Sequence, residues 1–297
     1  RPRHQRDAHD QRRRHHEDVG GGAAVLAERV EAHAVSIVPR MGFVQVQQDG
    51  TVATVTFSNP GKKNAIPSAA WPDMEATFRS LSVTPEVRCV VVTGEGDDFS
   101  SGADVSAPPQ ARQEHALVFM RSVGRAVEAL HSVPQPVIAR VAGVCVGAAL
   151  NLALGCDLVV ASDDARFSEI FARRGLSIDG GGSWILPRVV GLHRAKELAL
   201  LADILPAPEA ERLGLVNRVV PRADLDATVA SLAARLAAGP PLALSTTKRL
   251  LNQSAQVTLA QALEAEAQAQ SVNLASRDTA EAMAAFVERR DPHFEGH

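Results

Sequence analysis

The fold is decided by residues 140–162, which read RVAGVCVGAALNLALGCDLVVAS. The apolar run at 137–141 predicts a buried strand, the small residues at 147–155 predict a buried helix, and 158–161 predict another strand. A chain that passes from a strand through glycine into a helix leaves unpaired backbone N–H groups at the start of that helix. Such groups stabilise negative charge that develops on a ligand, although close helix packing explains the same small residues.

Strands and helices also alternate before this stretch. Residues 43–57 alternate between apolar and polar side chains around Asp49-Gly50, which predicts a β-hairpin. A helix is predicted at 68–81, and a strand buried on both faces at 86–93. The order β, β, α, β predicts an α/β core with parallel strand pairing.

After Gly191 the pattern becomes helical. Helices are predicted at 194–202, 208–213, 222–238, 241–252, 258–275 and 277–289. Their alanine-rich faces predict a C-terminal region that packs on a neighbouring element or on another subunit.

Composition excludes several classes of protein. The chain has 297 residues, 45% of them hydrophobic, so it can bury a sizeable core and is not disordered as a whole. A net charge of -3 gives no basic field for a phosphate backbone, so we expect no nucleic-acid partner. No apolar run approaches the roughly 20 residues that cross a bilayer, so we expect no membrane span. Cys89, Cys145 and Cys156 lie in apolar runs without CxxC spacing, which favours reduced thiols in a cytoplasmic protein and offers neither a metal site nor a redox cofactor.

Residues 1–40 differ from the rest of the chain. They open with RPRHQRDAHDQRRRHHED, show no strand or helix period, and cannot bury enough apolar surface to become ordered. We expect residues 1–40 to be a disordered or non-native extension, with Met41 as the true start of the protein. A basic tail and a transit peptide are the alternatives, and the acidic residues argue against the second.

A second informative motif is FSSGADV at 99–105, directly after the strand that is predicted to end near Thr93. Gly102 lets the backbone turn and approach a ligand closely, and successive N–H groups in such a turn can point at one oxygen. Taken alone, the motif is more typical of a simple turn.

Several motifs in a fixed order carry a family resemblance. FSSGADV precedes AGVCVGAALNLALGCD by about forty residues, and ARFSEIFARRGLSIDGGGSWILPRVVG follows at 165–191. NPGKKNAI at 59–66, ERLGLVNRVVP at 211–221 and AFVERRDPHF at 285–294 agree with the same pattern. From Met41 to His297 the chain resembles the enoyl-CoA hydratase/isomerase (crotonase) superfamily.

The resemblance implies a fold and an assembly. It predicts an α/β core of repeated ββα turns that form a spiral at 41–238, and a C-terminal α-helical trimerisation region at 239–297. Family members form homotrimers, often paired as hexamers. The implied substrate is an acyl-CoA thioester, with coenzyme A as part of the substrate and no separate cofactor.

The resemblance also implies site residues. It places the two backbone N–H donors of an oxyanion hole on Ser101 and Ala148. It places coenzyme A near Lys63, Ala65, Gly102, Ala103 and Asp104, with the region of Phe286 closing over the nucleotide.

One departure from the family pattern matters for the chemistry. Hydratases of the family use two glutamates to hold a water molecule and move its proton. Those positions are Asn151 and Phe171 here, and neither side chain can exchange a proton. Glu169 lies two residues from the second position, and we expect its side chain to point elsewhere.

Asp179 is the better candidate for proton transfer. Epoxyphenylacetyl-CoA isomerases of the family look similar here, with asparagine at the first glutamate position and aspartate before the glycine-rich entry to the next helix. One carboxylate can remove a proton at one carbon and return it at another, and an apolar wall that includes Phe171 would raise the pKa of Asp179. The structural alternative is that Asp179 caps the helix that begins near Gly181.

Three functions therefore compete. The favoured one is a CoA-thioester isomerase that uses Ser101, Ala148 and Asp179. The second is a hydratase that recruits Glu169 or a loop carboxylate, and the third is a non-catalytic acyl-CoA binder. We assign Glu114 and His115 to solvent, and Asp157 to a structural turn.

Overall fold

The computed structural model describes residues 42–106 and 114–297. The prediction for residues 1–40 and the start at Met41 lie outside the described residues. The main sheet has the strand order β1-β2-β3-β4-β6-β9. Its strands are β1 (Val44–Asp49), β2 (Val52–Phe57), β3 (Cys89–Gly94), β4 (Val137–Val141), β6 (Leu158–Ser162) and β9 (Arg218–Val220).

The predicted hairpin and the predicted parallel pairing are both confirmed. β1 pairs antiparallel with β2, from Val44 opposite Phe57 to Asp49 opposite Val52. Gly50, at the turn, has a φ of 55°, which glycine adopts without strain. The pairs β2–β3, β3–β4, β4–β6 and β6–β9 are parallel. The carboxyl ends of these parallel strands therefore share one edge of the sheet.

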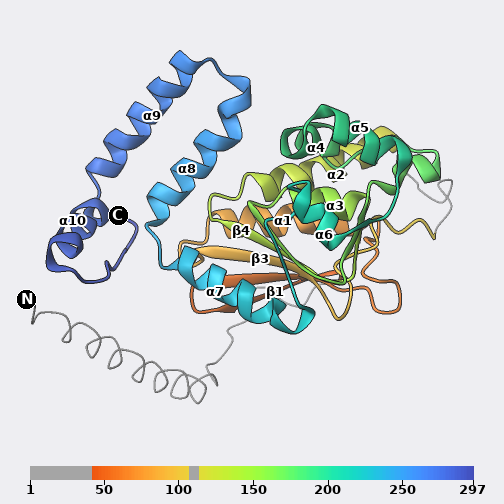
Figure 1. Cartoon of the computed structure of the whole chain (residues 1–297), viewed down its shortest axis with the longest axis horizontal. Helices are drawn as coiled ribbons and strands as arrows, with labels where there is room; N and C mark the ends of the chain where they lie inside the picture. Colours follow the sequence, from red (N-terminus) through yellow and green to blue (C-terminus); the bar gives the residue numbers. More distant parts are fainter. Residues whose placement is uncertain (1–41, 107–113) are drawn as a thin grey trace, which may run out of the picture. The chain divides into compact units, whose positions relative to one another are not determined.

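Helices cover both faces of the sheet (Figure 1). On one face, α1 (Ala70–Ser82) and α2 (Ala116–His131) bury Trp71, Phe78 and Leu130 against alternate strand residues. On the other face, α7 (Leu225–Ala237) buries Leu225 and Val229 against the remaining strand residues. The central strands β3, β4 and β6 are almost entirely buried, which explains their continuous apolar runs.

A second sheet of three short strands lies beside the start of α3 (Ala148–Leu154). Its strands are β5 (Val144–Val146), β7 (Arg166–Ser168) and β8 (Leu205–Pro206). β5 leads directly into α3, and β7 pairs with β5 in parallel. This sheet therefore fixes the entry to α3, where the predicted donor Ala148 lies.

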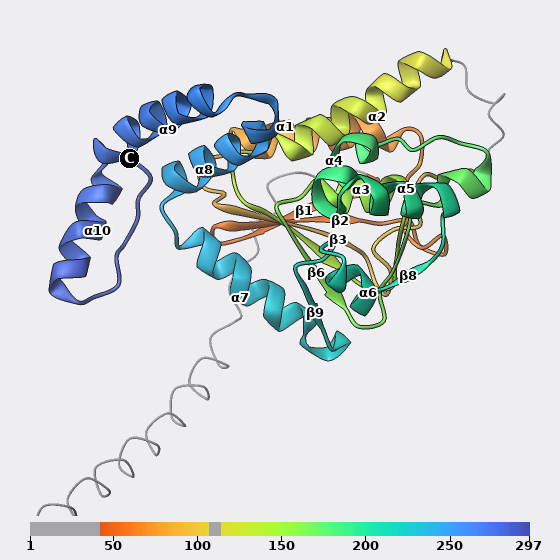
Figure 2. The same ribbon diagram turned by 45° about the horizontal axis from the view of Figure 1, so that its top comes forward.

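The remaining helices largely follow the predicted ranges after Gly191, whereas no range was predicted for the two before it. They are η2 (Ile170–Arg174), α4 (Gly182–Val190), α5 (Leu192–Leu201), α6 (Ala207–Arg212), η3 (Arg222–Asp224), α8 (Pro241–Gln253), η4 (Ser254–Gln256), α9 (Leu259–Leu274) and α10 (Arg277–Glu288). In the C-terminal region, α9 packs on α8 and on α10 (Figure 2). In the described part of the chain no single helix is long and apolar enough to cross a membrane. By length and composition alone, one pair of segments is, Arg222–Ala237 with Pro241–Gln256, with a bend of 105° between them.

Three parts of the sequence interpretation need correction. Residues 116–131 form the helix α2, which the sequence interpretation leaves out, and His115 is its N-cap, with Nδ1 accepting a hydrogen bond from the Leu117 N–H (3.2 Å). The segment after Gly191 is not purely helical, because β8 and β9 each join a sheet. β5 and β7 are also additional strands. Each of these strands has three residues or fewer, too few to show a period of two.

Candidate active site

The start of α3 is built on a backbone conformation that requires glycine. Gly147 has φ 59° and ψ -131°, and its N–H donates to the Ser168 carbonyl (2.8 Å). Every residue of α3 is buried. Ala148 is the first residue of the helix, so no carbonyl one turn earlier lies within α3 to accept its N–H.

The Gly102 turn lies against this point. Gly102 has a φ of 85°, and a Cβ built on it would lie 2.8 Å from the Val146 carbonyl oxygen and 3.7 Å from the Ala148 nitrogen. The buried Ser100 hydroxyl donates to the Asn64 carbonyl (2.6 Å) and accepts from the Gly102 N–H (3.2 Å). The structure therefore brings the two predicted donor segments together, although about forty residues separate them in sequence.

The Ser101 N–H already has an acceptor. It donates to the Lys63 carbonyl (2.9 Å). A thioester oxygen would have to share this N–H with Lys63 or displace the Lys63 carbonyl. The sequence interpretation did not foresee this contact.

Asn64 is a structural residue of the site that the sequence interpretation missed. Its buried amide donates to the Glu95 (2.9 Å) and Asp98 (2.8 Å) carbonyls, and its Oδ1 accepts from the Asn59 N–H (3.1 Å). Lys63 and Asn64 both have positive φ, 48° and 52°. The hydrogen bonds of Asn64 hold this strained loop, and the loop presents the Lys63 carbonyl to Ser101.

The residues predicted to contact coenzyme A lie around the same loop. Ala103 forms a parallel bridge with Ile66, and Ala65 is buried. The Lys63 ammonium is exposed and lies 3.8 Å from the Asp98 carboxylate. Lys62 Nζ and the Ser106 N–H donate hydrogen bonds to the Asp104 carboxylate (2.9 Å each), and these contacts lower the pKa of the Asp104 carboxyl to about 2. Asp104 is therefore an ionised, paired carboxylate at neutral pH.

Asp179 lies in the turn before α4, and the capping alternative for it is wrong. The N-cap of α4 is Gly181, with φ 82°, and no side chain makes a capping hydrogen bond there. The Asp179 backbone carbonyl accepts from the Gly182 N–H (3.0 Å). The side-chain Oδ1 is buried and has no hydrogen-bond partner among the described residues. Burial raises the pKa of this carboxyl to about 6, the direction expected from an apolar wall.

The Asp179 turn packs on the first turn of α3. A Cβ built on Gly180 would lie 3.4 Å from the Asn151 Cβ and 3.7 Å from the Ala148 Cα. The Asn151 amide donates to the Asp179 carbonyl (2.8 Å). The Phe171 ring also lies near the start of α3, 3.9 Å from a Cβ built on Gly147. The structure thus groups Asp179 with Ala148 and Gly102.

Glu169 also belongs to this group, although we expected its side chain to point elsewhere. Its exposed fraction is 1%, and its Oε2 accepts a hydrogen bond from the Asn151 amide (3.3 Å). Burial and, to a lesser degree, the charge of Asp179 raise the pKa of the Glu169 carboxyl to about 8. Two carboxyl groups with raised pKa values, those of Glu169 and Asp179, therefore lie close enough for the charge of one to act on the other.

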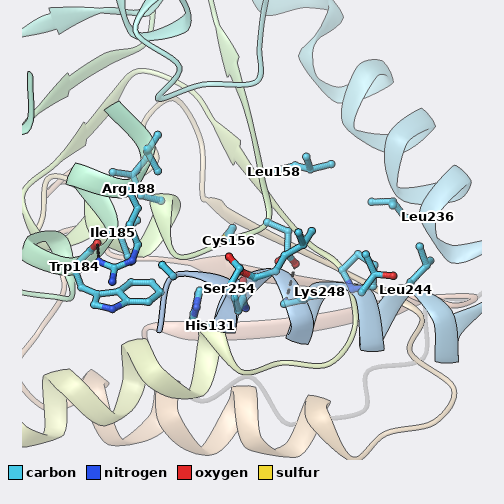
Figure 3. Close-up of a pocket in the computed structure, with 18 residues that line it drawn as sticks. His131, Cys156, Leu158, Trp184, Ile185, Arg188, Leu236, Leu244, Lys248 and Ser254 are labelled. Atoms are coloured by element: carbon cyan, nitrogen blue, oxygen red, sulfur yellow. Dashed lines mark hydrogen bonds and ion pairs between the residues drawn. The ribbon is translucent and has the colours of Figure 1, made fainter. Parts of the chain in front are cut away.

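A separate cavity of about 600 Å³ lies between the core and α8, at the far end of α3 (Figure 3). Arg188 stacks on the Trp184 ring (4.0 Å to the centroid), and the edge of His131 meets the same ring. Lys248 forms an ion pair with Asp157 (2.7 Å), and Asp157 Oδ2 also accepts from the Val137 N–H (2.7 Å). Asp157 is therefore structural, as predicted. Ser101, Ala148 and Asp179 do not line this cavity.

The fold and the grouping of these residues define the class of protein. A spiral α/β core with C-terminal helices brings the Gly102 turn, the start of α3 at Ala148 and the turn that carries Asp179 close together. The family model described as "Enoyl-CoA hydratase/isomerase" matches residues 47–297, so the chain belongs to the enoyl-CoA hydratase/isomerase family.

Relatives in the family carry both activity names. A "Probable enoyl-CoA hydratase" of Rhodobacter capsulatus is 36% identical over 245 residues, 82% of this chain and 95% of its own length. A "1,2-epoxyphenylacetyl-CoA isomerase" of Escherichia coli is 33% identical over 260 residues, 86% of this chain and 99% of its own length. The crystal structure of an enoyl-CoA hydratase from Polaromonas sp. JS666 superposes with a TM-score of 0.81 at 33% identity, covering 86% of this chain and 100% of the other.

Proposed function

We propose that the protein is an acyl-CoA thioester isomerase in which Asp179 moves a proton while backbone N–H groups hold the thioester oxygen. The observation that carries the proposal is the Asp179 carboxyl itself. It is largely buried, its Oδ1 has no partner among the described residues, and its turn packs on α3 beside Ala148. A carboxyl with a pKa of about 6 is mostly ionised at pH 7 and can still accept and return a proton.

The proposed reaction balances with one proton. The Asp179 carboxylate takes a proton from C2 of a 3-enoyl-CoA, and the electron pair of that C–H bond delocalises onto the thioester oxygen and C4. The N–H groups of Ala148 and, once released from Lys63, Ser101 stabilise the dienolate oxygen. Asp179 returns the proton to C4, and the double bond then lies between C2 and C3. Ring opening of an epoxide next to the same carbon would use the same base.

The test compares Asp179→Asn with Asp73→Asn, in which an exposed aspartate of α1 is changed. Both proteins are given a 3-enoyl-CoA, and the position of the double bond is followed by absorbance. We expect Asp179→Asn to lower kcat by about 10²–10⁴-fold and Asp73→Asn to leave it unchanged, because only the first removes the base. Calorimetry with the saturated acyl-CoA should show that both variants still bind the ester. Full activity of Asp179→Asn would overturn the proposal.

One observation favours a second candidate, an enoyl-CoA hydratase. Glu169 and Asp179 are two neighbouring carboxyl groups, because the charge of Asp179 acts on the pKa of Glu169, and hydration needs two groups to hold and deprotonate a water molecule. The wild-type protein is therefore also given a 2-enoyl-CoA of the same chain length, and water addition is measured by mass. Hydration at a rate above that of isomerisation would replace the first candidate with the second. Tight binding without turnover of either ester would favour an acyl-CoA binder.

A further inference from the structure

Glu169 is a buried acid that the proposed reaction does not use. It follows β7 directly, and the carbonyl of its neighbour Ser168 accepts the Gly147 N–H (2.8 Å). Glu169 is therefore tied by its own strand to the entry of α3. It lies outside both positions at which the family's hydratases carry a glutamate.

Asn151 connects Glu169 to the Asp179 turn. The Nδ2 group of Asn151 donates to Oε2 of Glu169 (3.3 Å) and to the backbone carbonyl of Asp179 (2.8 Å). Asn151 is fully buried, and Gly182 packs so closely on its amide that even a Cβ there would overlap the amide. The two hydrogen bonds that its Nδ2 group donates therefore define the orientation of the amide.

Among the residues that the structure describes, no cation on the surrounding elements compensates a charge on Glu169. Its Oε1 is buried and has no partner among the described residues, and no ion pair of Glu169 occurs there. The ionisable and charged groups on the elements around it are Asp179, Arg166 on β7, Cys145 on β5, Arg173 and Arg174 on η2, Arg188 on α4, and His193, Arg194, Lys196 and Glu197 on α5. Arg173 is paired with Asp203. Asp179 is the one of these groups whose charge acts on the pKa of Glu169, and it raises that pKa.

We propose that Glu169 is a positioning residue: as an uncharged acid it orients the Asn151 amide, and through that amide it holds the Asp179 turn against α3. A neutral carboxyl still offers Oε2 as an acceptor, and avoids an uncompensated buried charge. The inference rests on the proposed role of Asp179 as the base.

The test uses three variants. Glu169→Gln reproduces the shape and the acceptor of the neutral acid, Glu169→Leu removes the acceptor, and Glu86→Gln changes an exposed glutamate as a control. At pH 7 we expect Glu169→Gln to keep kcat and KM for the 3-enoyl-CoA within about threefold of wild type. Glu169→Leu should lower kcat about tenfold or more with little change in KM, because the Asp179 turn moves. Rescue by glutamine separates positioning from simple filling of space.

The pH profile tests the protonation state. As the pH rises through about 8, Glu169 ionises beside Asp179, so wild-type kcat should fall, and Glu169→Gln should lack this fall. Loss of kcat in Glu169→Gln as large as in Asp179→Asn would overturn the proposal, because Glu169 would then transfer the proton itself. Wild-type kcat in Glu169→Leu would also overturn it.

Stability gives a readout that needs no turnover. The pKa of Glu169 is raised from 4.5 to about 8 by folding, so its stabilising effect is full below pH 4.5 and is lost as the pH rises through 8. The Tm of wild type and of Glu86→Gln should therefore fall more between pH 6 and 9 than the Tm of Glu169→Gln. If the Tm of wild type and the Tm of Glu169→Gln changed equally with pH, the proposal that Glu169 is uncharged would be overturned. An inactive wild type that still shows the expected difference in slopes would instead contradict the proposed function alone.

Discussion

The carboxyl of Asp179 sets the lower pH limit at which the site can act as a base. Burial raises its pKa to about 6, so the carboxylate is protonated as the pH falls through this value. We expect kcat for the 3-enoyl-CoA to fall about tenfold per pH unit below 6, because only the ionised form accepts a proton. A profile of kcat between pH 4.5 and 7.5 measures this fall on the acidic side. A fall of kcat that begins only near pH 4, as expected for an exposed aspartate, would contradict the buried position of the Asp179 carboxyl.

The same residue should lower the stability of the fold. Folding raises the pKa of Asp179 from 3.8 to about 6, so its stabilising effect is full below pH 3.8 and is lost as the pH rises through 6. At pH 7 the folded protein therefore holds an unfavourable buried charge. Asp179→Asn should have a higher Tm than wild type at pH 7 and a smaller advantage at pH 4, whereas Asp73→Asn should match wild type at both. A lower Tm for Asp179→Asn at pH 7 would contradict this balance.

Local motifs predict some residues of the site and not others. Gly102, Ala148 and Asp179 lie in motifs whose spacing is visible in the sequence, and the structure brings them together. The direction of Glu169 depends on how β7 pairs with β5, which is a tertiary property. The occupied N–H of Ser101 likewise depends on a loop that Asn64 holds in place. Hydrogen bonds between distant segments leave little trace in one sequence.

Among the elements, the turn at Gly102 allows a matched test of close backbone approach. Gly102 and Gly96 both have positive φ, 85° and 71°, so alanine is strained at either position. A Cβ at Gly102 would lie 2.8 Å from the Val146 carbonyl oxygen, whereas nothing lies within 4 Å of one at Gly96. Gly102→Ala should therefore displace the turn and lower kcat by about 10²-fold, the effect of losing one oxyanion donor, whereas Gly96→Ala should keep kcat. Steady-state kinetics of both variants at equal folded fraction, checked by circular dichroism, decide the point. Equal kcat in the two would contradict a role for the turn.

Most of the long periodic elements could be predicted, and the shortest strands could not. The hairpin and the long C-terminal helices occupy almost the predicted ranges, because each has enough residues to show its period, whereas α3 was predicted from its small apolar residues. α2 was missed although Phe119, Val123, Ala126 and Leu130 form an apolar stripe. The small sheet was missed because strands of two or three residues form only when the surrounding fold supplies their partners.

For the whole molecule, the C-terminal helices raise the question of assembly. In α10, only Asp278 and Ala285 are buried, and Asp278 accepts hydrogen bonds from the N–H groups of Glu295 and Gly296 in the C-terminal tail. Met283, Phe286 and Val287 have the spacing of one helix face and are strongly exposed. An exposed apolar face of this kind is typical of an interface. The predicted homotrimer or hexamer would cover it.

Two valines allow a matched test of this assembly. Val287 on α10 and Val83 at the end of α1 are both 80% exposed in the single chain. Sedimentation equilibrium of wild type should give about three or six times the chain mass of 31.5 kDa. Val287→Asp should shift the distribution to smaller species, because aspartate would leave a charge in a dry interface, whereas Val83→Asp should keep the wild-type mass. A monomeric wild type, or the same mass for Val287→Asp, would contradict an α10 interface. A higher KM for acyl-CoA in Val287→Asp at unchanged mass would instead indicate that this helix closes over the nucleotide.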